Sequence, residues 1–160
     1  MGYYIRPARL KDVEKMRRLI SFYAAKKMML PRDQRYLHKL LANYSVAIAD
    51  GEFVGTCGFQ LWQPDSLEIV SLAVKPKFQR QGLGTALIQS VINKGVSLGF
   101  NYFFTLTLVP KLFLKSGFKK MNFKKIAFKV LADCRHCPKN DAGPGLGSCN
   151  EIPLELMVRT

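Results

Sequence analysis

A glycine-bearing segment between an apolar run and a helical pattern constrains this chain more than any other feature. The segment reads Gln79-Arg80-Gln81-Gly82-Leu83-Gly84-Thr85. It follows the strand-like run 67–74 and opens a helical pattern that lasts until Gly99. A glycine turn from a strand into a helix leaves backbone N–H groups unpaired at the positive helix end, which is typical of phosphate or pyrophosphate binding. We expect glycine at 82 and 84 because a side chain there would keep the ligand from the backbone.

The spacing of these glycines excludes two better-known phosphate-binding loops. A Walker loop needs lysine after its second glycine, and here Thr85 follows Gly84 directly. A dinucleotide fingerprint needs Gly-x-Gly-x-x-Gly, and only Gly82-x-Gly84 is present.

The pattern Gln-x-x-Gly-x-Gly after a strand that ends in Leu-Ala-Val resembles the acyl-CoA-binding loop of the GNAT acetyltransferase superfamily. The resemblance implies an α/β fold with a GNAT-like mixed central sheet flanked by helices, and acetyl-CoA bound at the strand–loop–helix. The cofactor-binding residues that it implies are Leu72, Ala73, Val74, Gln79, Arg80, Gln81, Gly82, Leu83, Gly84 and Thr85.

The hydrophobic pattern predicts the element order β-α-α-β-β-β-α-β-α-β in a single domain over residues 1–160. The expected strands cover 4–6, 45–49, 53–60, 67–74, 102–108 and 152–158. The expected helices follow residues 10–12, span 33–42, follow the glycine loop and span 111–116. We interpret Phe118 and residues 126–131 as further extended structure, and 138–148 as a Gly/Pro-rich loop.

Composition indicates a cytoplasmic enzyme. No apolar run approaches the ~20 residues that span a bilayer, and charges within residues 6–15 exclude a signal-peptide core. The net charge of +14 is densest in the lysine run 111–129. A solvated surface, attraction of polyanionic CoA or an acidic acceptor, and nucleic-acid binding all fit this charge, although no RNA-binding or helix-turn-helix pattern accompanies the lysines.

The resemblance implies direct attack of a primary amine on the thioester in a ternary complex. Because an amine is protonated at pH 7, a base must remove a proton. A glutamate on the strand before the loop often has that role in the family, and Glu68 matches it. The alternatives for Glu68 are a solvent-facing strand residue and a structural ion pair. The backbone of 72–74 is expected to pair with the pantetheine arm and polarise the thioester carbonyl, while its side chains lie in the core.

The usual general acid of the family is a tyrosine four residues before the glycine of a short helix. Counting back from Gly117 gives Phe113, which has no proton to donate. Either the CoA thiolate leaves unaided, or Tyr102, a water molecule or another group donates. Thr105 and Thr107 offer further hydroxyls.

Longer stretches are similar to short, stand-alone bacterial N-acetylglutamate synthase-like acetyltransferases. These stretches are 19–24, 29–32, 68–74 and the tail 133–152. The similarity implies an amino-acid acceptor such as L-glutamate and a homodimer. Arg32 is the candidate for gripping a substrate carboxylate, with a surface arginine as the alternative. Relatives often carry arginine where this chain has Val70, so a different amine stays open. Acetylation of a protein or peptide amine, and a non-catalytic nucleic-acid-binding domain, are the rival functions.

Three cysteines in the tail resemble part of a structural zinc site. Cys134-x-x-Cys137 and Cys149 surround one loop. Candidates for a fourth ligand are His136, His38 and Cys57. A reduced thiol cluster that joins the loop to the last strand is the alternative, and Cys57 is expected to be a small core residue.

Overall fold

A seven-stranded mixed sheet forms the centre of the computed structural model, which describes residues 2–62, 64–134, 137 and 149–159. The strands are β1 (Tyr3–Pro7), β2 (Ser45–Ala49), β3 (Glu52–Trp62), β4 (Ser66–Val74), β5 (Tyr102–Thr107), β6 (Lys119–Lys120) and β7 (Ile152–Met157). They lie in the order β1-β2-β3-β4-β5-β7-β6. β4 and β5 run parallel, and the other neighbours run antiparallel. The predicted mixed sheet is confirmed.

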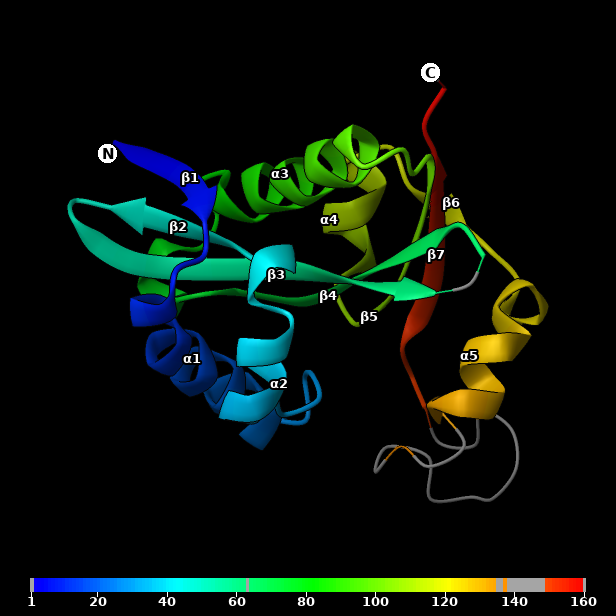
Figure 1. Ribbon diagram of the computed structural model, residues 1–160, viewed down its shortest axis with the longest axis horizontal. Helices are drawn as coiled ribbons and strands as arrows, with labels where there is room; N and C mark the ends of the chain where they lie inside the picture. The colour runs from blue at the N-terminus through cyan, green and yellow to red at the C-terminus, as the bar shows by residue number, and fades with distance from the viewer. Residues whose placement is uncertain (1, 63, 135–136, 138–148, 160) are drawn as a thin grey trace.

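Helices cover both faces of the sheet (Figure 1). α1 (Val13–Ala25) and α2 (Gln34–Lys39) lie on one face, and α3 (Leu83–Ser97) and α4 (Pro110–Lys115) on the other. Successive side chains of a strand point to opposite faces, so β2 serves two cores. Val46 and Ile48 pack in the cluster with α1, whereas Ala47 and Ala49 pack in the cluster with α3. Within the described residues, no helix has the length and apolarity to cross a membrane.

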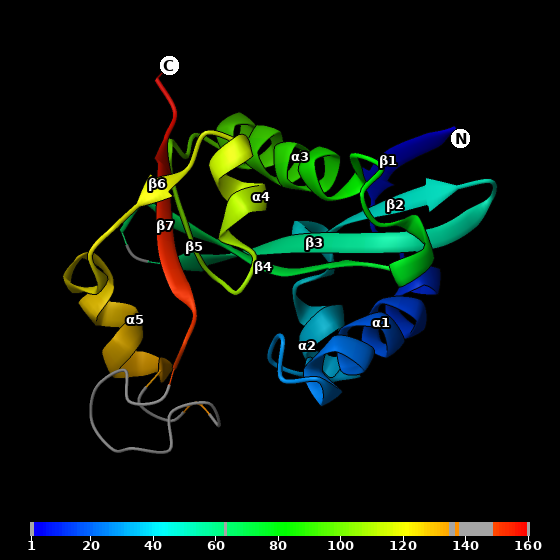
Figure 2. The same cartoon turned by 180° about the vertical axis from the view of Figure 1, so that it is seen from behind.

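The remaining helical elements are short. α5 (Ala127–Ala132) lies next to β7, at the opposite end of the molecule from α1 (Figure 2). The 3-10 helices are Leu10–Asp12, Leu41–Asn43, Pro76–Phe78 and Phe123–Ile126.

The prediction of extended structure over 126–131 is wrong, because this segment ends a 3-10 helix and forms α5. The Phe128 ring contacts the Trp62 ring, and the adjacent Lys129 bonds to Glu68. Two consecutive side chains therefore reach the same end of the sheet. A strand would point them to opposite faces. The predicted second helix is shorter than 33–42, since Asp33 caps it and it ends at Lys39. The expected loop at 138–148 lies outside the described residues.

The feature that positions the site is the separation of β4 from β5. Their pairing covers 66–68 and 102–104, after which β4 continues to Val74 and β5 to Thr107 without pairing with each other. Thr105 Oγ1 donates to the Ile69 carbonyl over 3.0 Å where the strands begin to part. Beyond this point, backbone groups on the facing edges of both strands are open to a ligand.

Candidate active site

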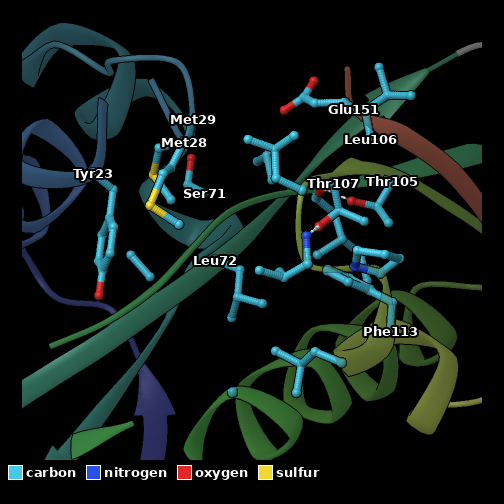
Figure 3. A pocket seen from close by; sticks show the side chains of 18 of the residues that line it. Tyr23, Met28, Met29, Ser71, Leu72, Thr105, Leu106, Thr107, Phe113 and Glu151 are labelled. Atoms are coloured by element: carbon cyan, nitrogen blue, oxygen red, sulfur yellow. Dashed lines mark hydrogen bonds between the residues drawn. The ribbon is translucent and has the colours of Figure 1, made fainter. Parts of the chain in front are cut away.

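A cavity of about 1150 Å³ opens where β4 and β5 separate. Pockets for small molecules usually measure about 300–1,000 Å³, so this one has room for a long ligand beside a second one. Figure 3 shows Tyr23, Met28 and Met29 on one wall and Thr105, Thr107 and Phe113 on the other, with Leu72 between them. The cavity therefore runs between the α1 side of the molecule and the β5–α4 side.

The glycine loop forms one end of this cavity. Gly82 is the N-cap of α3 at φ +84°, and Arg80 is also left-handed at φ +61°. A turn of this kind at the start of a helix can direct several backbone N–H groups toward an anion. The predicted residues that line the cavity here are Gln79, Arg80, Gly82, Gly84 and Thr85. Gln81 and Leu83 do not line it, and Leu83 is packed in the α3 core.

Packing gives a further reason for glycine at 84. A Cβ on Gly84 would lie 2.9 Å from Cδ2 of Leu112, so a side chain there would first require movement of the α4 leucine. Gly82 needs glycine for its backbone conformation instead.

A β-bulge shapes the wall formed by β4. Thr56 pairs with Ala73 and Gly58 with Val70, so Cys57 alone faces two residues of β4. One of them, Ser71, has φ +56°, and its Oγ lies 3.0 Å from the Tyr44 hydroxyl. Ala73 and Val74 are buried as predicted, but Leu72 is only partly buried and lines the cavity.

Glu68 lines the cavity at the last position where β4 pairs with β5. It is 5% exposed, which excludes the solvent-facing interpretation. Oε2 accepts hydrogen bonds from Trp62 Nε1 (2.9 Å) and from Lys129 Nζ (2.8 Å). Oε1 has no hydrogen-bond partner among the described residues and is not one of their buried unpartnered atoms, so it keeps accessible surface in a side chain that lines the cavity. Glu68 thus combines an ion pair with an oxygen that a ligand can reach.

Arg32 also lines the cavity. Its guanidinium carbon lies 4.4 Å from the centre of the Tyr36 ring. Its Nε is buried and has no hydrogen-bond partner among the described residues. A buried unpartnered donor is costly, so this atom suits an anionic ligand better than a solvated surface.

The hydroxyl groups of Tyr23 and Tyr102 are already engaged as donors. Phe113 is buried and packs edge-on against Phe118 at 5.3 Å, so no proton donor stands there. Tyr102 does not line the cavity, and its hydroxyl donates to Glu155. Tyr23 does line it, but its hydroxyl donates to the Val74 carbonyl. Thr107 Oγ1 accepts from Val109 N. The structure therefore adds no general acid to the predicted set.

The three tail cysteines also line the cavity. Cys134 is buried, and burial raises the pKa of its thiol to about 11. Cys149 Sγ lies 4.0 Å from an oxygen of Glu151. The described residues contain no group of three or more His, Cys, Asp or Glu side chains that could hold a metal, so the zinc prediction is unsupported. His136 lies outside the described residues, and Cys57 is a buried core residue as expected.

Lys129 is the site residue that sequence reasoning missed. It is buried, lines the cavity and bonds to Glu68 from 61 positions away. Its only sequence signal was membership of the lysine run 111–129, in which nothing separates a buried lysine from exposed ones.

The comparisons with known proteins agree with this geometry. Residues 11–118 match the model of the acetyltransferase (GNAT) family. An uncharacterized N-acetyltransferase of Chlorobaculum tepidum is 31% identical over 98% of this chain and 95% of its own length. The amino-acid acetyltransferase of Ralstonia nicotianae is 32% identical over 72% of this chain, which matches only 26% of that protein.

A solved structure shows the same fold. The N-acetylglutamate synthase of Neisseria gonorrhoeae, complexed with coenzyme A and N-acetyl-glutamate, has a TM-score of 0.85 at 23% identity. The match covers this whole chain and 36% of that one. With the glycine loop, the parted strands and the family match together, the chain belongs to the GNAT family and is an acetyl-CoA-dependent N-acetyltransferase.

Proposed function

We propose that this chain moves the acetyl group of acetyl-CoA to the α-amine of an amino acid, with L-glutamate as the first candidate. The observation that carries the proposal is the reachable Oε1 of Glu68, at the point where the two cavity walls meet. The phosphate-binding loop forms another part of the same cavity, so CoA and an acceptor fit it together.

The reaction needs one proton to leave the acceptor ammonium before its nitrogen can attack. Glu68 takes that proton, directly or through a water molecule. The nitrogen then attacks the thioester carbonyl, the C–N bond forms, the C–S bond breaks, and the attacking nitrogen gives up its second proton to water or to the departing thiolate. The sulfur leaves as a thiolate without a protein donor, since Phe113 has no proton to donate and the Tyr23 hydroxyl proton is engaged with the Val74 carbonyl. Peptide groups of the open β4 edge polarise the thioester carbonyl.

An amino-acid acceptor is supported by Arg32 and by the relatives. The unpartnered Nε of Arg32 can donate a hydrogen bond to a substrate carboxylate in this cavity. The Ralstonia relative is an amino-acid acetyltransferase, and the Neisseria structure holds N-acetyl-glutamate. Val70, in place of an arginine, is 7% exposed and supplies no charge, so an amino acid other than glutamate is the next candidate.

The test is turnover of acetyl-CoA with a panel of amines that includes L-glutamate, followed by mass detection of the acetylated product. Glu68→Gln is expected to lower kcat/KM by about 10²- to 10⁴-fold, the usual contribution of a general base. Glu155→Gln is the matched control. Glu155 is equally buried and is bonded by Tyr102 and Lys125, but it does not line the cavity.

Each rival function has its own outcome in this test. Turnover on peptides but not on free amino acids would indicate that the acceptor is a protein or peptide amine. CoA binding without any turnover, together with salt-sensitive RNA binding, would favour the non-catalytic nucleic-acid domain. The single domain, the homodimer and the cytoplasmic location stay predictions.

A further inference from the structure

Glu68 and Lys129 form an ion pair in which both side chains are almost fully buried. Their side chains are 7% and 8% exposed, and Oε2 lies 2.8 Å from Nζ. Lys129 comes from α5, and Glu68 comes from the middle of the sheet, so α5 brings the cation to the site. Nζ also lies 3.3 Å from Asp133, whose side chain is 49% exposed.

Aromatic rings surround this pair. The Trp62 and Phe128 rings are in tilted contact at 5.6 Å between centroids, and Phe104 meets Phe128 edge-on at 6.0 Å. Lys129 Nζ lies 5.2 Å from the centre of the Trp62 ring. A carboxylate in apolar surroundings tends to bind a proton, whereas an adjacent cation favours its charged form. A protonated Glu68 could not accept a proton from the acceptor, so the reaction depends on which effect is larger.

The ionisation of Lys129 is secured by its neighbours. Burial alone would lower the pKa of this ammonium, but the charge and hydrogen bond of Glu68, with Asp133, outweigh burial and raise the pKa. Cys134 and Tyr36 also face the pair, and burial raises both of their pKa values, so both stay neutral near pH 7. Arg32 contributes a positive charge beyond Tyr36. Lys129 is therefore a permanent cation in contact with Glu68.

We propose that Lys129 is a positioning residue that holds Glu68 as a carboxylate and occupies its Oε2, which leaves Oε1 for the proton of the acceptor. This inference rests on the proposed role of Glu68 as the base. α5 then belongs to the reaction machinery, although its lysine need not touch the substrate.

Trp62 allows a test that needs no acceptor. It is the single tryptophan of the chain, and its indole N–H donates to Glu68, so its fluorescence reports the charge on that carboxyl group. Wild-type emission measured across the pH range provides the reference profile. In Lys129→Met, we expect a new transition at higher pH than any transition of the wild type, because the cation that favours the carboxylate is gone.

Three further variants make the titration interpretable. Lys129→Arg keeps the charge and is expected to give the wild-type profile. The double variant Glu68→Gln/Lys129→Met removes both charges, which a fold commonly tolerates, and should give no new transition. A new transition in the double variant equal to that of Lys129→Met would overturn the proposal, because Glu68 would not be its source. A folded Lys129→Met with a flat profile would overturn it as well.

Asp133→Asn covers the case in which Lys129→Met does not fold. Asp133 is half exposed and competes with Glu68 for the ammonium. Its removal is expected to leave the acid transition in place or move it to lower pH. An upward move would contradict the proposal. The fluorescence results do not depend on turnover, so an inactive amine panel would count against the proposed function and not against this inference. With an active acceptor, the acid limb of kcat/KM should follow the same shifts.

Discussion

Arg32 is a cavity residue whose buried Nε has no hydrogen-bond partner among the described residues. It follows Pro31 directly before α2, and Tyr36 one helical turn later supports its guanidinium plane. The residue type predicted a carboxylate partner because the guanidinium fork matches a carboxylate. The structure adds burial and an unpartnered Nε, which a sequence pattern cannot show.

Arg32→Ala is expected to raise the acceptor KM by about 10- to 100-fold, because one or two charge-assisted hydrogen bonds to the acceptor are lost. The kcat should change much less. Arg32→Lys should recover only part of the loss, because an ammonium cannot form two parallel bonds. The exposed neighbour Arg35 is the matched control, and Arg35→Ala should leave KM unchanged. An unaltered KM in Arg32→Ala would remove this residue from the acceptor site. Steady-state kinetics at saturating acetyl-CoA provide the measurement.

At the scale of elements, the strand–loop–helix from β4 to α3 is the part in which sequence and structure agree best. Local physics is sufficient there: an apolar run forms a strand, and Gly82 supplies the left-handed turn into α3. α5 shows the opposite case. Its six residues are too few for a helix to be stable alone, and its position depends on contacts with Trp62 and Glu68.

The loop yields a prediction with an internal control. Gly82 and Gly51 both have positive φ, but only Gly82 lines the cavity, whereas Gly51 lies in the β2–β3 turn. Alanine at either position is expected to lower the free energy of unfolding by about 1–2 kcal/mol, the cost of a left-handed residue with a Cβ. Gly82→Ala should also weaken CoA binding by about tenfold or more, through lost backbone hydrogen bonds. Calorimetric titration with CoA would check this, and equal CoA affinities in the two variants would contradict the phosphate-binding role.

For the molecule as a whole, one ion pair ties the first strand to the helix that follows. Asp12 is 2% exposed, and Arg6 donates to both of its carboxylate oxygens over 2.7 and 2.9 Å. Burial would raise the pKa of Asp12, but the hydrogen bonds from Arg6 and from the Arg9 backbone outweigh it and lower that pKa. A carboxyl group with a depressed folded-state pKa stabilises the fold above its unfolded pKa and loses that effect as the pH falls through the folded value.

Asp12→Asn is therefore expected to lower the free energy of unfolding at pH 7 by on the order of 2 kcal/mol, with the deficit shrinking below about pH 4. Urea denaturation at pH 7 and at pH 3 would measure both values. The exposed Asp65 provides the control, and Asp65→Asn should change stability by less than about 0.5 kcal/mol at either pH. A deficit that is equal at both pH values would contradict an ionic origin.

The local sequence and the tertiary structure determined different parts of this site. Strand alternation, helix periodicity and glycine turns act over a few residues, so the chain already specified its mixed α/β class, the loop 79–85 and the place of Glu68 beside it. The parting of β4 from β5, the bulge at Ser71 and the approach of Lys129 from 61 residues away required the assembled sheet. No local pattern encodes these features, because they follow from which distant side chains can be buried together.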